Sequence, residues 1–353
     1  MSIPTLEDIE AKPLTTERIT SRVLFSPKRG EAPVLILHGN WSSATWWEEV
    51  MLGLPSGFWG IAPDQRGYGE ADISKKVDAR RGARDWADDI LALLDHLHIQ
   101  KAHILGCSLG GYIAWQCLKD FPERMSSLIL VNPVSPYGFC GTKDPEGTPC
   151  YPDFAGTGGG IKNEELIQRA KERDRSLESE SSPRSSMRSL FKPPFIPNRE
   201  ETLLSSVLAT HLGEKDLPGD YVPSPHWPFV APGIWGPLNA TSPKYADDIQ
   251  ALYEISEKIP ILWIHGSHDQ VISNRSTSDI GYLGKLGLIS GWPGEDVYPP
   301  QPMIRQTRTV LEKYASAGGS YREVVIEGAG HVPFLEKPDA FNSVFHSFLK
   351  EVA

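Results

Sequence analysis

The residues with the clearest chemical potential are Gly106-Cys107-Ser108-Leu109-Gly110. This G-x-S-x-G run lies between an apolar segment predicted as a strand, 102–105, and a predicted helix over 111–118. A sharp strand-to-helix turn forces its serine into strained backbone angles, and only small neighbours leave room for that geometry. Such a turn would present the Ser108 hydroxyl as a nucleophile. It would also direct the Leu109 N–H, at the helix N-terminus, toward a developing oxyanion.

A serine hydroxyl needs a base to take its proton, and the base needs an acid to orient it. Two later apolar segments end beside suitable side chains, since 261–265 leads into Asp269 and 324–327 leads into His331. Small residues before each side chain let it turn back over the sheet edge toward Ser108. We therefore expect Ser108, His331 and Asp269 to act as nucleophile, base and acid.

Other polar residues near these positions are not expected to be catalytic. Asn132 follows another predicted strand, but an amide cannot stabilise an imidazolium by charge. His268, next to the proposed acid, is expected to face solvent or pack in its loop. The segment 64–69 is expected to form a turn held by an Arg66 ion pair.

A second N–H donor for the oxyanion should come from the loop that follows the apolar segment 34–37. That loop contains His38, Gly39, Asn40 and Trp41. His38 is expected to fix the loop through a hydrogen bond. Either Asn40 or Trp41 supplies the N–H, and both alternatives stay open.

The elements that position these residues alternate between strands and helices. Short continuous apolar runs are typical of strands buried on both faces of a parallel sheet. A helix is predicted where apolar residues from Trp86 to Leu97 fall on one stripe, and another where they do so from Phe341 to Leu349. A weak alternation over 17–26 suggests an N-terminal strand beside 34–37. The strands are predicted at 34–37, 57–62, 102–105, 127–131, 261–264 and 323–326.

The middle of the chain differs from the rest in amino-acid composition. Residues 136–250 hold 15 of the 30 prolines, which makes a regular sheet there improbable. Residues 163–179 have helical propensity, and a second Gly- and Pro-rich insertion is expected at about 273–302. We therefore predict an α/β core formed by residues 1–135 and 251–353, with 136–250 inserted as a lid or cap.

The composition of the chain argues against several classes of function. With 353 residues and a formal charge of −10, the chain lacks the cation excess of a nucleic-acid or anionic-membrane surface. Residues 1–13 have no apolar core of a secretory leader, and no apolar run could span a bilayer, so a cytoplasmic protein is expected. Four cysteines are too scattered for a zinc site. Free thiols are favoured, with a bridge between Cys140 and Cys150 left open.

Together these motifs resemble the α/β-hydrolase fold superfamily, in its cofactor-free serine-hydrolase form. The resemblance covers about 17–135 and 255–353, and it implies a mostly parallel eight-stranded sheet flanked by helices, with a large lid after the sixth strand. It also implies no cofactor and no metal ion. Relatives that dehalogenate or open epoxides use an aspartate nucleophile, and Ser108 excludes that chemistry here. The motifs are 38–40, 64–69, 106–111, 266–269, and 330–331 with 336–338.

The expected activity is hydrolysis of a carboxylic ester or lactone through an acyl-enzyme. Aromatic residues of the predicted lid suggest a mid-sized, uncharged, apolar or aromatic substrate, although they could equally form the lid's own core. A carbon–carbon bond hydrolase acting on a diketone and a slowly hydrolysing small-molecule receptor are the alternatives. Whether the chain is a monomer or a dimer stays open. The proposed substrate-binding residues are Tyr221, Trp227, Phe229 and Trp235.

Overall fold

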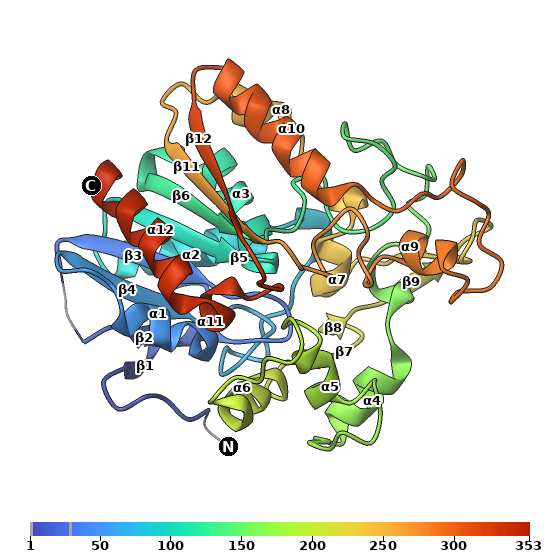
Figure 1. Cartoon of the computed structure of the whole chain (residues 1–353), viewed down its shortest axis with the longest axis horizontal. Helices are drawn as coiled ribbons and strands as arrows, with labels where there is room; N and C mark the ends of the chain where they lie inside the picture. The colour runs from blue at the N-terminus through green and yellow to red at the C-terminus, as the bar shows by residue number, and fades with distance from the viewer. Residues whose placement is uncertain (1–2, 28–29) are drawn as a thin grey trace.

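The centre of the molecule is an eight-stranded sheet. The computed structural model describes residues 3–27 and 30–353. Met1 and Ser2, which belong to the segment 1–13 in which no secretory leader is expected, lie outside the described residues. The strand order is β1-β2-β4-β3-β5-β6-β11-β12 (Figure 1). The strands are β1 (Glu10–Thr15), β2 (Thr20–Phe25), β3 (Ala32–Leu37), β4 (Phe58–Pro63), β5 (Ala102–Cys107), β6 (Met125–Val131), β11 (Pro260–Gly266) and β12 (Ser320–Ile326).

Six of these strands run parallel, which confirms the predicted mostly parallel α/β sheet. Every residue of the central strand β5 is buried, as its continuous apolar run indicates. The N-terminal strand differs from the prediction. β2 pairs antiparallel with β1 and β4 rather than with the strand at 34–37, because β4 occupies that edge of β3.

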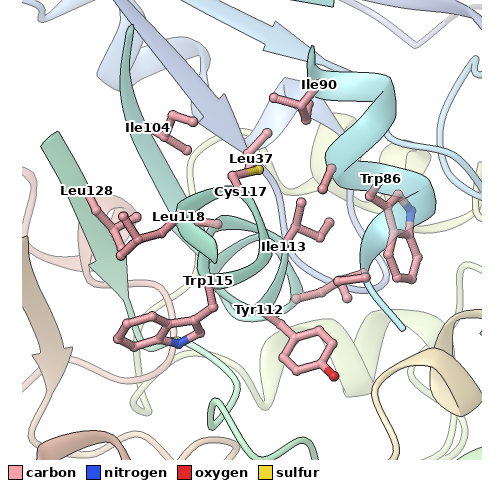
Figure 2. Packing of buried hydrophobic residues seen from close by; sticks show 14 of the residues in the cluster. Leu37, Trp86, Ile90, Ile104, Tyr112, Ile113, Trp115, Cys117, Leu118 and Leu128 are labelled. Carbon is pink, nitrogen blue, oxygen red and sulfur yellow. The ribbon is translucent and has the colours of Figure 1, made fainter. Parts of the chain in front are cut away.

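Helices cover both faces of the sheet. Leu35 and Leu37 pack with α2 (Arg84–His96) and α3 (Leu109–Asp120) on one face, whereas Val34 and Ile36 pack with α12 (Pro338–Val352) on the other. Figure 2 shows the first layer, in which side chains of α2 and α3 meet those of the strands. The flanking helices are α1 (Glu48–Leu52), α2 (Arg84–His96), α3 (Leu109–Asp120), α8 (Gln250–Glu254), α10 (Met303–Ser316), α11 (Pro333–Glu336) and α12 (Pro338–Val352).

The stability of this first layer is expected to depend strongly on Trp86. Its side chain is 1% exposed, and its indole N–H donates to the Arg66 carbonyl at 2.9 Å. We expect Trp86→Ala to lower the free energy of unfolding by about 3–5 kcal/mol, because it leaves a large cavity. Urea denaturation measures this loss. Trp86→Phe, which keeps most of the packing, should cost clearly less, and equal effects of the two variants would contradict a packing role.

A long insertion separates β6 from β11. It consists mainly of short helices and two small two-stranded sheets, as its proline content indicates, and most of it lies to the right of and below the sheet in Figure 1. Of the segment 163–179, which has helical propensity, only α4 (Glu164–Lys171) is an α-helix. The elements are α4 (Glu164–Lys171), α5 (Pro183–Arg188), α6 (Glu200–Val207), β7 (Leu212–Gly213), β8 (Leu217–Pro218), β9 (Tyr221–Pro223), β10 (Val230–Pro232) and α7 (Pro237–Ala240).

A smaller insertion between β11 and α10 contains α9 (Ile280–Lys285). The remaining regular elements are short 3-10 helices at Ala44–Trp47, Ala79–Arg81, Pro122–Arg124, Gly158–Ile161 and Pro243–Tyr245. The four cysteines are free thiols, so Cys140 and Cys150 are not bridged. Within the described residues, no helix combines the length and the apolar character that crossing a bilayer requires.

Candidate active site

Ser108 lies at the turn between β5 and α3 in strained backbone geometry. Its φ is 55° and its ψ is −116°, a region that non-glycine residues rarely occupy. The neighbouring glycines make this turn possible. A Cβ on Gly106 would lie 2.2 Å from the Gly110 carbonyl oxygen, and a Cβ on Gly110 would lie 2.2 Å from that of Leu37. Larger side chains at either position would force the turn apart.

His331 and Asp269 meet at the carboxyl end of the sheet. Asp269 follows β11, and His331 follows β12. The His331 Nδ1 and the Asp269 Oδ2 are 2.9 Å apart, and both side chains are buried. The other carboxylate oxygen of Asp269 accepts the N–H groups of Val271 at 2.7 Å and Ile272 at 3.1 Å. The carboxylate is therefore fixed on both sides.

Asn132 holds the loops of these two residues together. Its side-chain Nδ2 donates to the His331 carbonyl at 2.7 Å, and its Oδ1 accepts the Gly266 N–H at 3.1 Å. The side chain is fully buried at the end of β6. Its amide thus serves as a structural bridge, as expected for a group that cannot supply charge. His268, by contrast, is exposed, as predicted.

The loop after β3 is held by a neutral histidine. Burial lowers the pKa of His38 to about 4, although its hydrogen bond with Gly39 opposes this shift. The Gln65 N–H donates to the His38 Nε2 at 3.0 Å, so the ring proton lies on Nδ1, which donates to the Gly39 carbonyl at 2.8 Å. His38 therefore fixes the loop by hydrogen bonds, as predicted.

The two candidate oxyanion donors in this loop differ in their partners. The Trp41 N–H donates to the Asn40 side-chain Oδ1 at 3.0 Å. The Tyr68 hydroxyl donates to the same oxygen at 2.8 Å. Tyr68 belongs to the turn 64–69, whose predicted ion pair is confirmed, since the Arg66 Nη2 lies 2.7 Å from the Asp89 carboxylate. The Trp41 N–H is thus already engaged.

A cavity of about 640 Å³ is lined by five of the predicted site residues. Ser108, Leu109 and His331 line it, and Asn40 and Trp41 line it as well. Lys162 is the one Lys, Arg, Asp or Glu among the described lining residues. The walls are mainly apolar and aromatic, with Trp46, Trp47, Tyr68, Phe139, Leu166, Met187, Leu238, Ile280, Leu283 and Phe334 among the lining residues.

Residues 34–344 match the model of a protein family described as "Alpha/beta hydrolase family". The chain belongs to this family. The sheet order and the insertion after β6 agree with that assignment.

Relatives of this alpha/beta hydrolase carry several different names. Epoxide hydrolase 1 of Siraitia grosvenorii is 27% identical over 98% of this chain and 100% of its own length. The 2-hydroxymuconate semialdehyde hydrolase of a Pseudomonas strain is 34% identical over 28% of this chain and 36% of its own length. Other curated relatives are likewise matched over only 30 to 46% of their own length. Apart from the epoxide hydrolase, the chain thus spans less than half the length of these relatives.

Two solved esterase structures share the fold of this alpha/beta hydrolase. A thermophilic esterase from Thermogutta terrifontis is 19% identical, with a TM-score of 0.57 over 97% of this chain and 99% of the other. Carboxylesterase CesB from Bacillus subtilis is 17% identical, with a TM-score of 0.57 over 97% of this chain and 91% of the other. At these identities the likeness is one of fold.

The structure does not bring the four predicted substrate-binding residues of this alpha/beta hydrolase to the cavity. Trp227 is buried against Tyr298, with ring centroids 5.1 Å apart, in a small core of its own. Phe229 is 63% exposed and Tyr221 is 49% exposed. Trp235 lies under the Lys215 ammonium, 4.9 Å from its ring centroid. These residues sit on or beside the β9–β10 hairpin.

The aromatic walls come instead from residues elsewhere in the chain, Trp46 and Trp47 among them. Trp47 is fully buried and stacks on Phe334, with ring centroids 3.9 Å apart. Trp46 stacks on Phe191 of the insertion at 6.2 Å. The consecutive Trp pair that follows the loop 38–41 is the sequence signal that could have indicated these walls.

Among the described residues, no group of three or more His, Cys, Asp or Glu side chains is placed to hold a metal ion.

Proposed function

We propose that this alpha/beta hydrolase is a serine hydrolase that cleaves carboxylic esters or lactones through an acyl-enzyme. One observation carries the proposal: Ser108, held at positive φ, shares a mainly apolar cavity with a histidine whose Nδ1 is bonded to a buried carboxylate. We further propose that residues 1–135 and 251–353 form the catalytic core and that 136–250 acts as its lid.

In the first step the Ser108 Oγ attacks the substrate carbonyl carbon. Because the Asp269 carboxylate occupies the Nδ1 side of His331, the Nε2 is the basic nitrogen that takes the serine proton. The imidazolium that forms is stabilised by Asp269. The imidazolium then gives this proton to the leaving alkoxide oxygen as the C–O bond of the ester breaks, which leaves the acyl group on Ser108.

In the second step His331 takes a proton from a water molecule, whose oxygen attacks the acyl carbon. The carboxylic acid leaves, and the proton returns to Ser108. Both steps pass through an oxyanion. We assign one stabilising donor to the N–H of Leu109, the first residue of α3. The other we assign to the N–H of Asn40 rather than Trp41, because the Trp41 N–H is bonded to the Asn40 side chain.

Tyr68 offers a test of this second donor. Its hydroxyl and the Trp41 N–H both bind the Asn40 Oδ1, so Tyr68 helps to hold the donor loop. We expect Tyr68→Phe to lower kcat about tenfold with little change in KM, because one hydrogen bond that orients the loop is lost. Ester kinetics measure this effect, and Tyr245→Phe, in a tyrosine that does not line the cavity, is the control. A rise in KM alone would indicate a substrate contact instead.

The cavity supports an uncharged substrate of moderate size. Its lining contains many apolar side chains, and Lys162 already lies 3.8 Å from the exposed Glu164 carboxylate. No cofactor is needed for this chemistry. The natural partner is accordingly a small-molecule ester or lactone rather than a nucleic acid.

A panel of substrates tests the proposal. We expect multiple turnovers with p-nitrophenyl esters of short and medium acyl chains, or with lactones. Turnover of diketones but not of esters would favour a carbon–carbon bond hydrolase, to which the name of the Pseudomonas relative draws attention. No arginine among the described residues lines the cavity to polarise a second carbonyl, which argues against it. A single turnover without recycling would favour a ligand receptor.

A further inference from the structure

The long insertion reaches the loop that carries His331. This histidine loop, residues 327–332, connects β12 to α11. The His331 backbone N–H donates to the carbonyl of Leu190, which follows α5 in the insertion, at 2.7 Å. The backbone of the proposed base is therefore hydrogen-bonded directly to the insertion.

Glu336 makes a second connection on the other side of the same segment. One oxygen of its carboxylate accepts the Gly330 N–H of the histidine loop at 2.6 Å, and the other accepts the Lys192 N–H at 2.6 Å. The side chain belongs to a residue that is only 8% exposed. Two short bonds to a buried carboxylate are strong ones. Glu336 thus joins the insertion backbone to the residue that precedes His331.

The absence of a side chain at Gly330 allows the insertion to approach the histidine loop closely. A Cβ at this position would lie 2.7 Å from the Leu190 carbonyl oxygen and 2.9 Å from the Lys192 nitrogen. Both atoms belong to backbone, which cannot move aside as a flexible side chain can. The insertion therefore sits closer to the histidine loop than any other residue type at 330 would permit.

The same segment of the insertion also forms a wall of the cavity. We call residues 189–192 the docking segment. Ser189 and Leu190 line the cavity, and Phe191 stacks on Trp46, which lines it as well. One stretch of four residues therefore contacts both the substrate space and the backbone of the proposed base.

We propose that Glu336 is a positioning residue through which the docking segment holds His331 in its working place. The inference rests on the proposed function of Ser108, His331 and Asp269. Without the carboxylate, the Gly330 and Lys192 N–H groups lose their shared acceptor. The histidine loop is then free to shift relative to Ser108, and a displacement of about 1 Å can cost about 10²-fold in rate.

Kinetics of Glu336→Ala and Glu336→Gln on two esters test the proposal. With p-nitrophenyl acetate and p-nitrophenyl octanoate, we expect Glu336→Ala to lower kcat about 10- to 100-fold on both, with KM changed less than about threefold. Glu336→Gln keeps the size and one acceptor oxygen, so its kcat should lie between those of Glu336→Ala and the wild type. If Glu336→Ala does not fold, Glu336→Gln alone carries the comparison.

The matched control is Glu327→Gln, a change at an exposed glutamate of the same loop, which should leave both esters unaffected. A merely structural role in shaping the wall would raise KM for the octanoate and spare kcat for the acetate. That result, or a wild-type kcat in Glu336→Ala, would overturn the proposal.

Hydrogen–deuterium exchange separates this inference from the proposed function, because it needs no turnover. We expect faster exchange of the Gly330, His331 and Lys192 amides in Glu336→Ala than in wild type and Glu327→Gln. Unchanged exchange would overturn the inference even if the wild type is an active esterase. Faster exchange in a chain that hydrolyses neither esters nor lactones would refute the proposed function and leave the structural coupling intact.

Discussion

Replacing Ser108 by alanine is expected to abolish ester turnover, with kcat lowered by at least about 10⁴-fold and by up to about 10⁶-fold. Ser108 occupies the turn between β5 and α3 and lines the cavity together with His331, so the substitution removes the proposed nucleophile. Activity remaining above the uncatalysed rate would come from the oxyanion donors and substrate binding alone.

The same variant should fold normally. Alanine is no larger than serine and meets the same backbone geometry, so the strain at φ 55° is unchanged by the substitution. The thermal midpoint should therefore move by less than about 2 °C. A fluorophosphonate should label the wild type once per chain, detected as one mass addition by mass spectrometry, and should not label Ser108→Ala.

Ser186→Ala is the matched control, since Ser186 lines the same cavity from α5. It should keep wild-type kcat and wild-type labelling. If Ser108→Ala retained turnover while remaining unlabelled, the nucleophile would be another group, and the proposed mechanism would have to be abandoned.

The sequence allowed much of the core and of the site to be predicted, because both depend on local chemistry. Continuous apolar runs locate buried parallel strands, and the glycines around Ser108 mark a turn that only small residues permit. The carboxyl ends of parallel strands meet at one edge of the sheet, which is why residues as distant as Asp269 and His331 can be expected side by side.

The cavity walls could not be predicted in the same way. The aromatic run from Tyr221 to Trp235 has the composition of a binding surface, but Trp227 is buried in a small cluster with Ile280 and Tyr298, and Tyr221 and Phe229 are exposed. Whether the aromatic residues of 221–235 or those around Trp46 line the cavity beside Ser108 depends on how the insertion folds back on the sheet. That packing involves contacts such as Trp46 with Phe191, far apart in sequence and without a local pattern.

Glu336 illustrates a further limit. The resemblance to the family draws attention to residues 336–338, but its two acceptor bonds connect backbone N–H groups of Gly330 and Lys192. Backbone donors carry no residue-type signal. Gly330 is another trace of the junction in the sequence, because the close approach of the insertion leaves no room for a Cβ at this position.

Asp269→Asn is expected to lower kcat about 10⁴-fold while leaving KM and folding nearly unchanged. The carboxylate accepts a hydrogen bond from the His331 Nδ1–H, with Nδ1 and Oδ2 2.9 Å apart. An asparagine that turns its amide nitrogen toward the ring would donate instead, which favours the tautomer with the proton on Nε2. That tautomer cannot take the proton of Ser108, so the base is lost although every side chain keeps its place.

The fold should tolerate this change because the remaining asparagine oxygen can still accept the Val271 and Ile272 N–H groups. Asp248→Asn, at an exposed aspartate, is the matched control and should leave kcat unchanged. Steady-state kinetics and the rate of fluorophosphonate labelling both report the effect, and the two should fall together because both need an activated Ser108. An Asp269→Asn enzyme within about tenfold of wild type would mean that another group orients His331, and the assignment of the acid would then be wrong.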